Sequence, residues 1–335
     1  MNSTFGWDIG GVNTKAARVA HGRVLDTRVM PYEIQRNPAA LAPLLDRLAR
    51  QLGAGRGDTH AVTMTAELSQ VFRTKREGVG FVLDAVTAAF PEASVRVWSV
   101  DGGWRTPDEA RRAPLAVAAA NWTATARFVG RTLPDCLLID VGSTTTDVIP
   151  IVAGAPAAVG RTDFERLREG ELVYTGAVRT PAEAIAPTVL VGGRPTGVSA
   201  EGFALAGDVH LWRGQLAPED YSAPTPDGRP ATRAFAGERL ARVVCADREM
   251  LDETAITAIA ASLWEAQVSR IREAVDRART RHAPMRRAVV TGLGDFLATE
   301  AAQRAGLQVT HLADTLGAAA RHAPAAAVAL LLSPS

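Results

Sequence analysis

Lysine is almost absent from this chain of 335 residues. Only Lys15 and Lys75 are lysines among the 37 basic residues, and all the others are arginines. The 36 acidic residues balance them, so the net charge is +1 and overall charge gives no reason to bind nucleic acid or an anionic membrane. We therefore do not expect this protein to bind polyanions through its overall charge. The scarcity of lysine also makes the position of each lysine informative.

Cysteine is scarce as well. Cys136 and Cys245 form neither a disulfide framework nor a metal-ligand spacing, and Cys136 lies in an apolar run typical of a buried strand. The six histidines have no metal-ligand spacing either. The chain therefore does not look like a zinc protein or a disulfide-stabilised secreted domain, and we expect a reducing, cytoplasmic location.

The chain has no apolar run of membrane-spanning length. The C-terminal run from Ala323 to Leu332 is about half of the roughly 20 residues that a spanning helix needs. The N-terminus lacks the basic region and apolar segment of a signal peptide. We expect no membrane partner and predict a buried terminal helix.

Length and periodicity predict two α/β lobes. A chain of 335 residues with 47% apolar and 22% charged residues is too long for most single cores. Strand patterns alternate with helix patterns at 37–52 and 79–90, which is typical of an α/β lobe, and a long amphipathic helix is predicted at 253–282. We place the lobes at 1–132 and 133–335, with packing of the terminal helix back on the first lobe as an alternative.

Two stretches share one design. FGWDIGGVNTKAARV (5–19) and CLLIDVGSTTTDVIPI (136–151) each run from apolar residues to an aspartate, then to glycine and small residues, then to a second β-type run. The pattern predicts strand, tight glycine turn, strand. Because the unit occurs twice, roughly one lobe apart, it indicates two related lobes that act on one polyphosphate.

The residues of these units suit phosphate and magnesium. Small residues let a ligand approach the backbone N–H groups of a turn, and a strand-end carboxylate suits Mg²⁺, which prefers few protein ligands and phosphate oxygens. The alternative is that each aspartate simply caps its turn. The candidate metal and catalytic carboxylates are Asp8 and Asp140, and the candidate phosphate-binding residues are Gly10, Gly11, Asn13, Thr14, Lys15, Gly142, Ser143, Thr144 and Thr145.

Other candidates lie between and after the two units. Glu67 ends a predicted strand and precedes a basic cluster that suits an anionic substrate, although a solvated charged loop explains the same residues. Asp101 is also at a strand end, and Asn121 precedes a tryptophan more often found in helix packing. The Gly-rich turn at 291–294 allows a ligand to approach or simply forms a tight strand–helix turn. These candidates are Glu67 and Asp101 as catalytic carboxylates, Arg73, Lys75, Arg76 and Asn121 for substrate, and Gly292 and Gly294 for phosphate or nucleoside.

The motifs resemble those of the superfamily of acetate and sugar kinases, Hsp70 chaperones and actin. The matching segments are Asp8-Ile-Gly-Gly, Asp140-Val-Gly-Ser and Thr291-Gly-Leu-Gly294, and Lys15 stands seven residues after Asp8, as a lysine does in actin-like first motifs. The resemblance implies an α/β, two-lobed actin-like ATPase (ribonuclease H-like) fold with a central cleft.

A closer resemblance covers nearly the whole chain. Several stretches of the chain are similar to hydantoinase A/oxoprolinase-related proteins of tetrahydromethanopterin-linked one-carbon transfer. They are GWDIGGVNTKAA, VTMTAEL with FRTKREGV, AAANWTATA, LLIDVGSTTTDVIPI, GELVYTGAVRTP and ERLARVVCAD. Archaeal members act as a methanofuran-pathway synthase. It joins an aminomethylfuran-methyl diphosphate to γ-glutamyltyramine and releases diphosphate.

The resemblance implies a cytoplasmic transferase with Mg²⁺ and two small-molecule substrates, a diphosphate and a phenolic amine. Asp8 and Asp140 would hold Mg²⁺, the turns and Lys15 would hold the diphosphate, and Glu67 or Asp101 would take the phenol proton. The first alternative is an ATP-dependent kinase or an oxoprolinase-type amidohydrolase. The second is an actin-like nucleotide switch, which the lack of long partner-binding segments disfavours. A homo-oligomer stays open.

Overall fold

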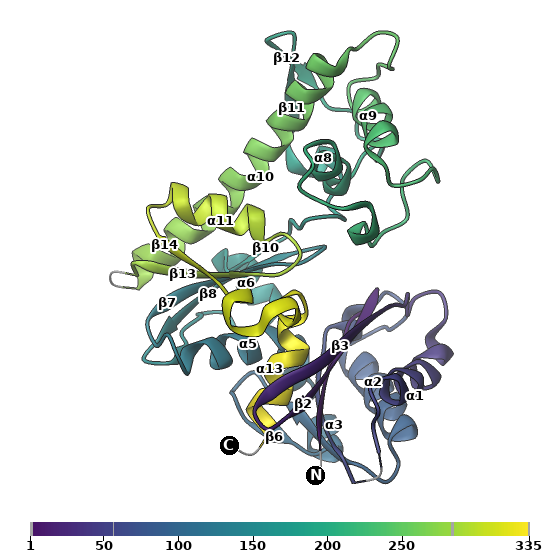
Figure 1. The fold of residues 1–335 in the computed structure, drawn as a ribbon, viewed down its shortest axis with the longest axis vertical. Helices are drawn as coiled ribbons and strands as arrows, with labels where there is room; N and C mark the ends of the chain where they lie inside the picture. The colour runs from purple at the N-terminus through teal and green to yellow at the C-terminus, as the bar shows by residue number, and fades with distance from the viewer. Residues whose placement is uncertain (1–2, 56, 283–284, 334–335) are drawn as a thin grey trace. The chain divides into compact units, whose positions relative to one another are not determined.

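The computed structural model describes residues 3–55, 57–282 and 285–333. Within these residues the chain forms two compact α/β units (Figure 1). Unit 1 is drawn from Met1–Cys136, Ile149–Arg166 and Leu312–Ser335, and unit 2 from Leu137–Val148 and Leu167–His311. The division at Cys136 lies close to the expected lobe boundary, but two later segments of the chain return to unit 1.

Unit 1 is built on a mixed sheet of six strands. The strand order is β3-β2-β1-β4-β5-β6, in which β1 is antiparallel to β2 and parallel to β4. The hairpin connections and the parallel β1–β4–β5 crossovers follow from the predicted alternation of strands and helices. The strands are β1 Thr4–Ile9, β2 Asn13–Ala20, β3 Arg23–Pro31, β4 Thr59–Met64, β5 Ser94–Trp98 and β6 Trp104–Arg105.

Helices cover both faces of this sheet, because alternate residues of β1 point to opposite sides. Phe5, Trp7 and Ile9 enter a core shared with α1 and α2. The other face packs against α13, where Gly6 approaches the helix backbone. The helices of this unit include α1 Leu41–Gln51, α2 Lys75–Ala89, α3 Pro107–Arg112, α4 Pro114–Val117, α5 Asn121–Gly130, α12 Ala313–Leu316 and α13 Ala323–Leu332, with 3-10 turns η1 Pro38–Ala40, η2 Ala66–Leu68 and η4 Gly317–His322.

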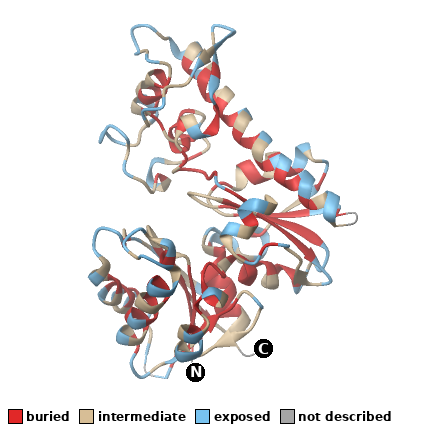
Figure 2. Ribbon diagram, turned by 180° about the vertical axis from the view of Figure 1, so that it is seen from behind, coloured by how far each residue is buried: buried red, intermediate tan, exposed pale blue. Residues whose placement is uncertain are grey.

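The C-terminal helix is part of the core of unit 1. By length and hydropathy alone, Ala313–Leu332 is one candidate for a membrane span in the described chain. Its helix α13 packs against β1, β2, β4 and α5, however, and Ala325 to Ala329 are fully buried (Figure 2). These contacts are those of a core helix, in agreement with the predicted buried terminal helix.

Replacement of Gly6 by alanine is expected to destabilise unit 1. A Cβ at this position would lie 1.9 Å from the backbone oxygen of Ala325. Because a backbone atom cannot yield without moving α13, we expect a loss of roughly 3 kcal/mol or more, measured by denaturant unfolding. Gly80 of α2 has nothing within 4 Å, so Gly80→Ala is the matched control and should be neutral or stabilising. A Gly6→Ala protein of wild-type stability would contradict the packing of α13.

The second sheet has the order β10-β8-β7-β13-β14, with β9 paired to β8. The strands β7, β13 and β14 are parallel to one another, and most residues of β7 and β13 are buried. The strands are β7 Cys136–Val141, β8 Thr146–Val152, β9 Ala155–Pro156, β10 Leu172–Val173, β13 Arg287–Thr291 and β14 Gln308–His311, and a separate hairpin is formed by β11 Thr188–Val191 and β12 Arg194–Gly197.

The long helix α10 organises the core of unit 2. Asp252 caps it by accepting a hydrogen bond from the Ala255 N–H at 2.8 Å, and its buried stripe joins one core with β7 and α11. The predicted helix at 253–282 is therefore present. The segment 154–235 contains short helices besides its strands and loops. The remaining helices are α6 Asp163–Glu169, α7 Ala182–Ile185, α8 Ala206–Trp212, α9 Arg233–Arg242, α10 Glu253–Arg281 and α11 Asp295–Arg304, with η3 Pro218–Asp220.

Candidate functional site

The first glycine turn joins β1 to β2. The Gly10 N–H donates to the Asn13 carbonyl at 3.0 Å and closes the turn. A Cβ on Gly10 would lie 2.7 Å from the same oxygen, so the tight turn depends on glycine at this position. Thr14, the second residue of β2, pairs with Ile9, and its side chain is fully buried.

The carbonyl groups of this turn are occupied and its central amides are not. The Ile34 N–H donates to the Gly11 carbonyl at 3.0 Å, and the Tyr32 N–H donates to the Val12 carbonyl at 2.9 Å. The N–H groups of Gly11 and Val12 have no acceptor among the residues that the structure describes. Such a turn presents donors without acceptors, which is the arrangement that backbone anion sites use.

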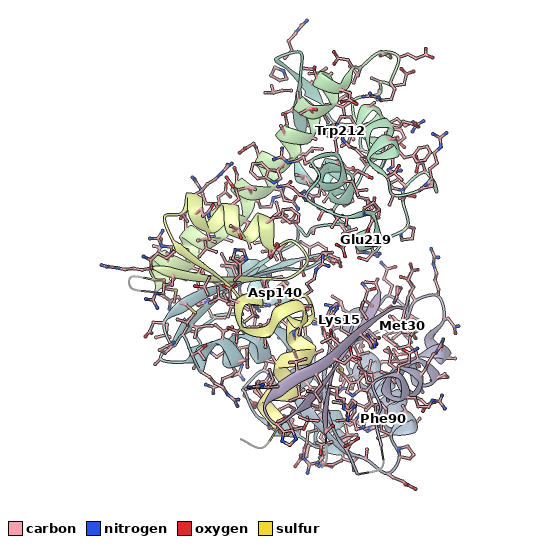
Figure 3. The ribbon with its side chains drawn as sticks, in the orientation of Figure 1. Lys15, Met30, Phe90, Asp140, Trp212 and Glu219 are labelled. Carbon is pink, nitrogen blue, oxygen red and sulfur yellow. The ribbon has the colours of Figure 1, made fainter. Side chains whose placement is uncertain are left out.

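Asp8 and Lys15 are directly opposite each other on β1 and β2. The seven-residue offset seen in the sequence is therefore a cross-strand pair, and both side chains lie on one face of the sheet. The Lys15 ammonium donates to Asp8 Oδ2 at 3.4 Å (Figure 3 labels Lys15). Asp8 is 4% exposed, and its Oδ1 has no hydrogen-bond partner in the described part of the chain. A buried carboxylate oxygen without a partner is an exception that calls for a ligand.

The second turn, between β7 and β8, repeats the first. The Gly142 N–H donates to the Thr145 carbonyl at 2.9 Å, so both turns close in the same way. The Gly142 carbonyl accepts from the Ala177 N–H at 2.9 Å, and the Ser143 carbonyl accepts from the Val178 and Arg179 N–H groups. Within the described ranges the N–H groups of Ser143 and Thr144 have no acceptor. The hydroxyls of Ser143 and Thr144 are 3.5 Å apart on the same turn.

A buried polar network supports the second turn from behind. Gly176 packs so closely that a Cβ there would lie 2.5 Å from the Thr144 nitrogen. Gln267 of α10 donates to the Gly176 carbonyl and to Thr175 Oγ1, each at 2.8 Å. Gln267 also pairs with His210, whose pKa burial lowers to about 4 and whose ring is therefore neutral. The segment 175–180 is thus a support for the turn, a role that sequence reasoning did not assign.

Asp140 is the next-to-last residue of β7 and is half-buried beside the Gly-rich turn after β13 (Asp140 is labelled in Figure 3). Gly292 has φ +94°, and a Cβ on it would lie 2.5 Å from Asp140 Oδ1. The Gly294 N–H donates to the Val141 carbonyl at 2.8 Å. Close packing against the end of β7 therefore accounts for both glycines, and whether they also admit a nucleoside or phosphate stays a prediction.

Glu67 is a buried carboxylate beside Lys75. It lies in η2, directly after β4, and it is 1% exposed. Its Oε1 is 3.7 Å from the Lys75 ammonium, which also contacts Asp163 Oδ2 at 3.3 Å. Burial raises the pKa of the Glu67 carboxyl to about 7, against the opposite effect of Lys75. A carboxyl with this pKa exists in both protonation states near neutral pH, as a general base requires.

The other basic residues of this cluster do not join the pair. Arg73 and Arg76 are exposed at the start of α2, and neither side chain has a hydrogen bond or ion pair to another described residue. They are free to meet an anionic substrate, but the structure gives them no buried partner. Asp163 is a member of the cluster that sequence reasoning missed, because it lies 88 residues from Lys75 along the chain.

Asp101 has the contacts of a turn-capping carboxylate. It accepts from the Ser99 hydroxyl at 2.7 Å, the Gly103 N–H at 3.0 Å and Arg105 at 2.6 Å. The hydrogen bond from Ser99 is the largest of the causes that hold the pKa of Asp101 below its ordinary value. This lowered pKa makes Asp101 a weaker proton acceptor than Glu67, so we favour Glu67 as the base.

Asn121 and Trp122 begin α5 in different surroundings. Asn121 is half-buried, and its side chain has no hydrogen bond to any residue in the described ranges. Trp122 is 5% exposed, and the Arg166 guanidinium lies 4.1 Å from the centre of its ring. The tryptophan therefore packs inside unit 1, and Asn121 alone keeps a free amide for a substrate.

The carboxylates of the two glycine turns suit a magnesium ion better than a metal ion that protein side chains alone must coordinate. No group of three His, Cys, Asp or Glu side chains in the described residues is placed to hold a metal. Mg²⁺ commonly uses one or two carboxylates and completes its coordination with water and phosphate oxygens. The unpartnered Oδ1 of Asp8 is one oxygen of that kind.

Comparisons with known proteins identify relatives over most of the chain. The family model described as Hydantoinase/oxoprolinase matches residues 58–334. A protein of Methanocaldococcus jannaschii named (4-{4-[2-(gamma-L-glutamylamino)ethyl]phenoxymethyl}furan-2-yl)methanamine synthase is 37% identical over 297 residues, 88% of this chain and 87% of that protein. A protein of the same name from Methanococcus vannielii is 36% identical over 177 residues, 52% of this chain and 79% of that protein.

Solved structures share the fold at low identity. An acetone carboxylase has a TM-score of 0.58 and 14% identity, with 98% of this chain and 70% of that chain covered. A ROK family glucokinase from Streptomyces griseus has a TM-score of 0.51 and 14% identity, with 98% of each chain covered. The expected α/β, actin-like ATPase fold is thereby confirmed, and the synthase relatives mean that the protein is an enzyme.

Proposed function

The chain belongs to the hydantoinase/oxoprolinase family, and from this we propose that it is a transferase that forms an aryl ether in the biosynthesis of a methanofuran-type cofactor. One substrate is an aminomethylfuran-methyl diphosphate, and the other is a phenolic amine such as γ-glutamyltyramine. The relatives' name supports this, because it describes a phenoxymethylfuran, in which a phenol oxygen joins a furanylmethyl carbon. We further propose that the enzyme is cytoplasmic.

One observation carries the proposal: both turns have occupied carbonyls and central amides without protein acceptors. A leaving diphosphate offers several anionic oxygens, and donors fixed in advance stabilise the charge that develops on them. We propose that each turn can donate to diphosphate oxygens through these amides, which are those of Gly11 and Val12 in the first turn and of Ser143 and Thr144 in the second. Lys15 adds a positive charge beside the first turn.

Bound Mg²⁺ would neutralise charge on the leaving diphosphate. Asp8, with its unpartnered Oδ1, and Asp140 are the carboxylates that would hold the ion. The bond from the methylene carbon to the diphosphate oxygen breaks, and its electron pair leaves with the diphosphate. The furan delocalises the positive charge left on that carbon, and the phenol oxygen forms the new bond.

We propose that Glu67 accepts the phenol proton. Its pKa of about 7 gives a fraction of the carboxylate at neutral pH, and its burial keeps water from competing for the proton. Lys75 lies between Glu67 and Asp163, and its positive charge favours the ionised form of Glu67. After the proton transfer, the same charge would favour loss of the proton from Glu67 and so restore the carboxylate.

We expect the reaction to consume no nucleotide. With Mg²⁺, a furanmethyl diphosphate and a phenolic amine, one diphosphate should be released for each ether formed, because the leaving group is already part of the substrate. Both products are measured by chromatography and a phosphate assay, with and without ATP. One-to-one coupling of ATP hydrolysis to product would instead place the chain among ATP-dependent kinases or amidohydrolases. ATP turnover without any small-molecule product would indicate a nucleotide switch.

Replacement of Lys15 by alanine should weaken binding of the diphosphate substrate and leave binding of the phenolic amine nearly unchanged. A charge-assisted contact to phosphate oxygens is lost, so KM for the diphosphate should rise about tenfold while KM for the phenolic amine stays near wild type. Arg28→Ala on β3, which removes an exposed cation paired with Asp26, is the control and should change neither. A defect confined to the acceptor would contradict the placement of the diphosphate at the first turn.

A further inference from the structure

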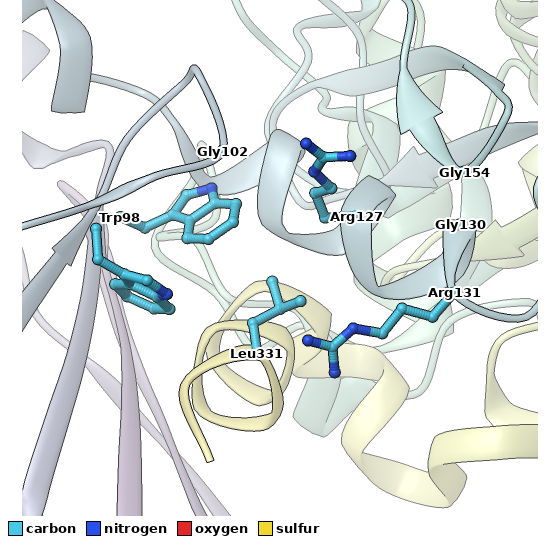
Figure 4. A pocket seen from close by; sticks show the side chains of 8 residues that line it. Trp98, Gly102, Arg127, Gly130, Arg131, Gly154 and Leu331 are labelled. Atoms are coloured by element: carbon cyan, nitrogen blue, oxygen red, sulfur yellow. The ribbon is translucent and has the colours of Figure 1, made fainter. Parts of the chain in front are cut away.

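A cavity of about 320 Å³ lies in unit 1, and none of the candidate site residues discussed above lines it, although Asp101 directly precedes its lining residue Gly102 (Figure 4). Its larger lining side chains come from two strands and two helices. They are Trp98 of β5, Trp104 of β6, Arg127 of α5, Arg131 at the C-terminal end of α5 and Leu331 of α13. None of the residues of the first turn lines it, and neither do Asp8, Glu67 and Lys75. An explanation for this cavity must therefore be sought in its own chemistry.

Two of its side chains are cations without a carboxylate partner. Arg127 has no hydrogen bond or ion pair to any residue that the structure describes, and Arg131 has one long hydrogen bond, to the Leu330 carbonyl at 3.4 Å. The two stand four residues apart on one helical face, where like charges repel. Arg105 nearby is paired with Asp101 at 2.6 Å, so unpaired arginines are not the rule in this region. The pair is suited to an anion.

The opposite part of the cavity is aromatic and apolar. The rings of Trp98 and Trp104 are 4.9 Å apart and nearly perpendicular. Trp98 is 2% exposed and donates from Nε1 to Thr123 Oγ1 at 2.7 Å, which fixes its ring, whereas Trp104 is half-buried. Together with Leu331, Trp104 offers a flat apolar surface of the kind that an aromatic ring packs against.

Gly102 gives Arg127 the space to reach this cavity. Its φ is +84°, and a Cβ on it would lie 3.2 Å from Arg127 Nε. A smaller cavity of about 100 Å³ shares Gly102 and Arg127 and also contacts Asp101. Since Asp101 is held by Arg105, Ser99 and Gly103, it forms no ion pair with Arg127. The Arg127 guanidinium thus lies on the wall between two cavities with its charge unneutralised by the described residues.

We propose that the larger cavity binds a small anion that carries one aromatic ring, such as an aryl phosphate or an aryl carboxylate. The acid group lies between Arg127 and Arg131, and the ring packs on Trp104 and Leu331. The volume is at the lower end of the range for small-molecule sites, so it suits a single ring. This site is separate from the proposed transferase chemistry and does not depend on it.

Calorimetric titration of the full chain with phenyl phosphate tests the proposal. Magnesium is left out, so that binding at the glycine turns contributes little. We expect saturable binding in the millimolar range or below, and we expect inorganic phosphate and benzyl alcohol, which carry only one half of the ligand each, to bind at least about tenfold more weakly. Saturable binding that is equally tight for inorganic phosphate would overturn the aromatic part of the proposal, and no saturation would overturn all of it.

Variants separate this cavity from other sites. Arg127→Gln combined with Arg131→Gln should weaken phenyl phosphate by about tenfold or more, because charge-assisted hydrogen bonds are lost. Trp104→Leu should weaken the binding of phenyl phosphate and leave the binding of inorganic phosphate unchanged. This variant provides a second measurement should the arginine double variant fold poorly. Arg23→Gln, at an exposed position of β3, should leave the affinity for phenyl phosphate unchanged. Wild-type affinity in the arginine double variant would refute the site.

Discussion

Asparagine in place of Asp8 is expected to reduce turnover by at least roughly 10²–10³-fold while the fold survives. The substitution keeps the size of the side chain and removes the negative charge that Mg²⁺ requires. Asp8 Oδ1 is buried and has no partner in the described chain, so no existing hydrogen bond of that oxygen is broken. The measurement is diphosphate release at saturating Mg²⁺, with thermal unfolding to verify the fold. Asp140→Asn should have the same effect, since its turn closes in the same way.

A surface carboxylate provides the control for these variants. Asp26 of β3 forms an exposed ion pair with Arg28, and surface pairs of this kind contribute little to stability. Asp26→Asn should keep wild-type activity. Near-normal Mg²⁺-dependent turnover in both Asp8→Asn and Asp140→Asn would refute the proposed roles of the two strand-end carboxylates.

Glutamine in place of Glu67 is expected to lower kcat by about 10²–10⁴-fold, the usual contribution of a general base. In the wild type only the ionised carboxyl accepts the proton, so the rate should rise with pH through about 7. This rise should be missing from the residual activity of Glu67→Gln. Exposed Glu249 supplies the control, and Glu249→Gln should keep both the rate and its pH profile. A variant that is slow but keeps the rise near pH 7 would assign the base to another group.

The same carboxyl should affect stability with pH. Its pKa is raised from 4.5 to about 7 on folding, so between these values the folded chain holds a proton that the unfolded chain releases. The wild type should therefore lose stability as pH rises through this window, by up to about 3 kcal/mol for the full shift. Glu67→Gln lacks this ionisation, so it should lose less stability over the window and be the more stable protein at pH 8.

The two turns could be predicted from sequence because their information is local. An apolar run, an aspartate and a glycine turn specify strand, turn and strand within about 15 residues. The partners of the turn carbonyls could not be predicted, since Tyr32 and Ile34 follow a third strand and the segment 177–179 lies beyond β10. Sequence therefore indicated that amides would be available, and only the structure shows why the carbonyls are not.

The basic cluster near Glu67 illustrates the opposite case. Lys75 stands close to Arg73 and Arg76 in sequence, and similar charge predicted a common role. In the structure Lys75 turns inward to Glu67 and Asp163, while the two arginines stay exposed at the start of α2. Burial depends on what the rest of the chain brings to a position, and Asp163 comes from a segment far along the sequence. Periodicity within one helix carries no information of that kind.

The position of α13 bears on the order in which the protein can mature during translation. The last strand of the unit 1 sheet ends at Arg105, but the helix that covers the Gly6 face of β1 begins only at Ala323. Until α13 has been made, β1 and β2 lack the helix that packs on them, and an apolar sheet face in a nascent protein is a natural target for chaperones. A polypeptide that stops before α13 would contain every strand of its first sheet and still leave β1 and β2 without their helix.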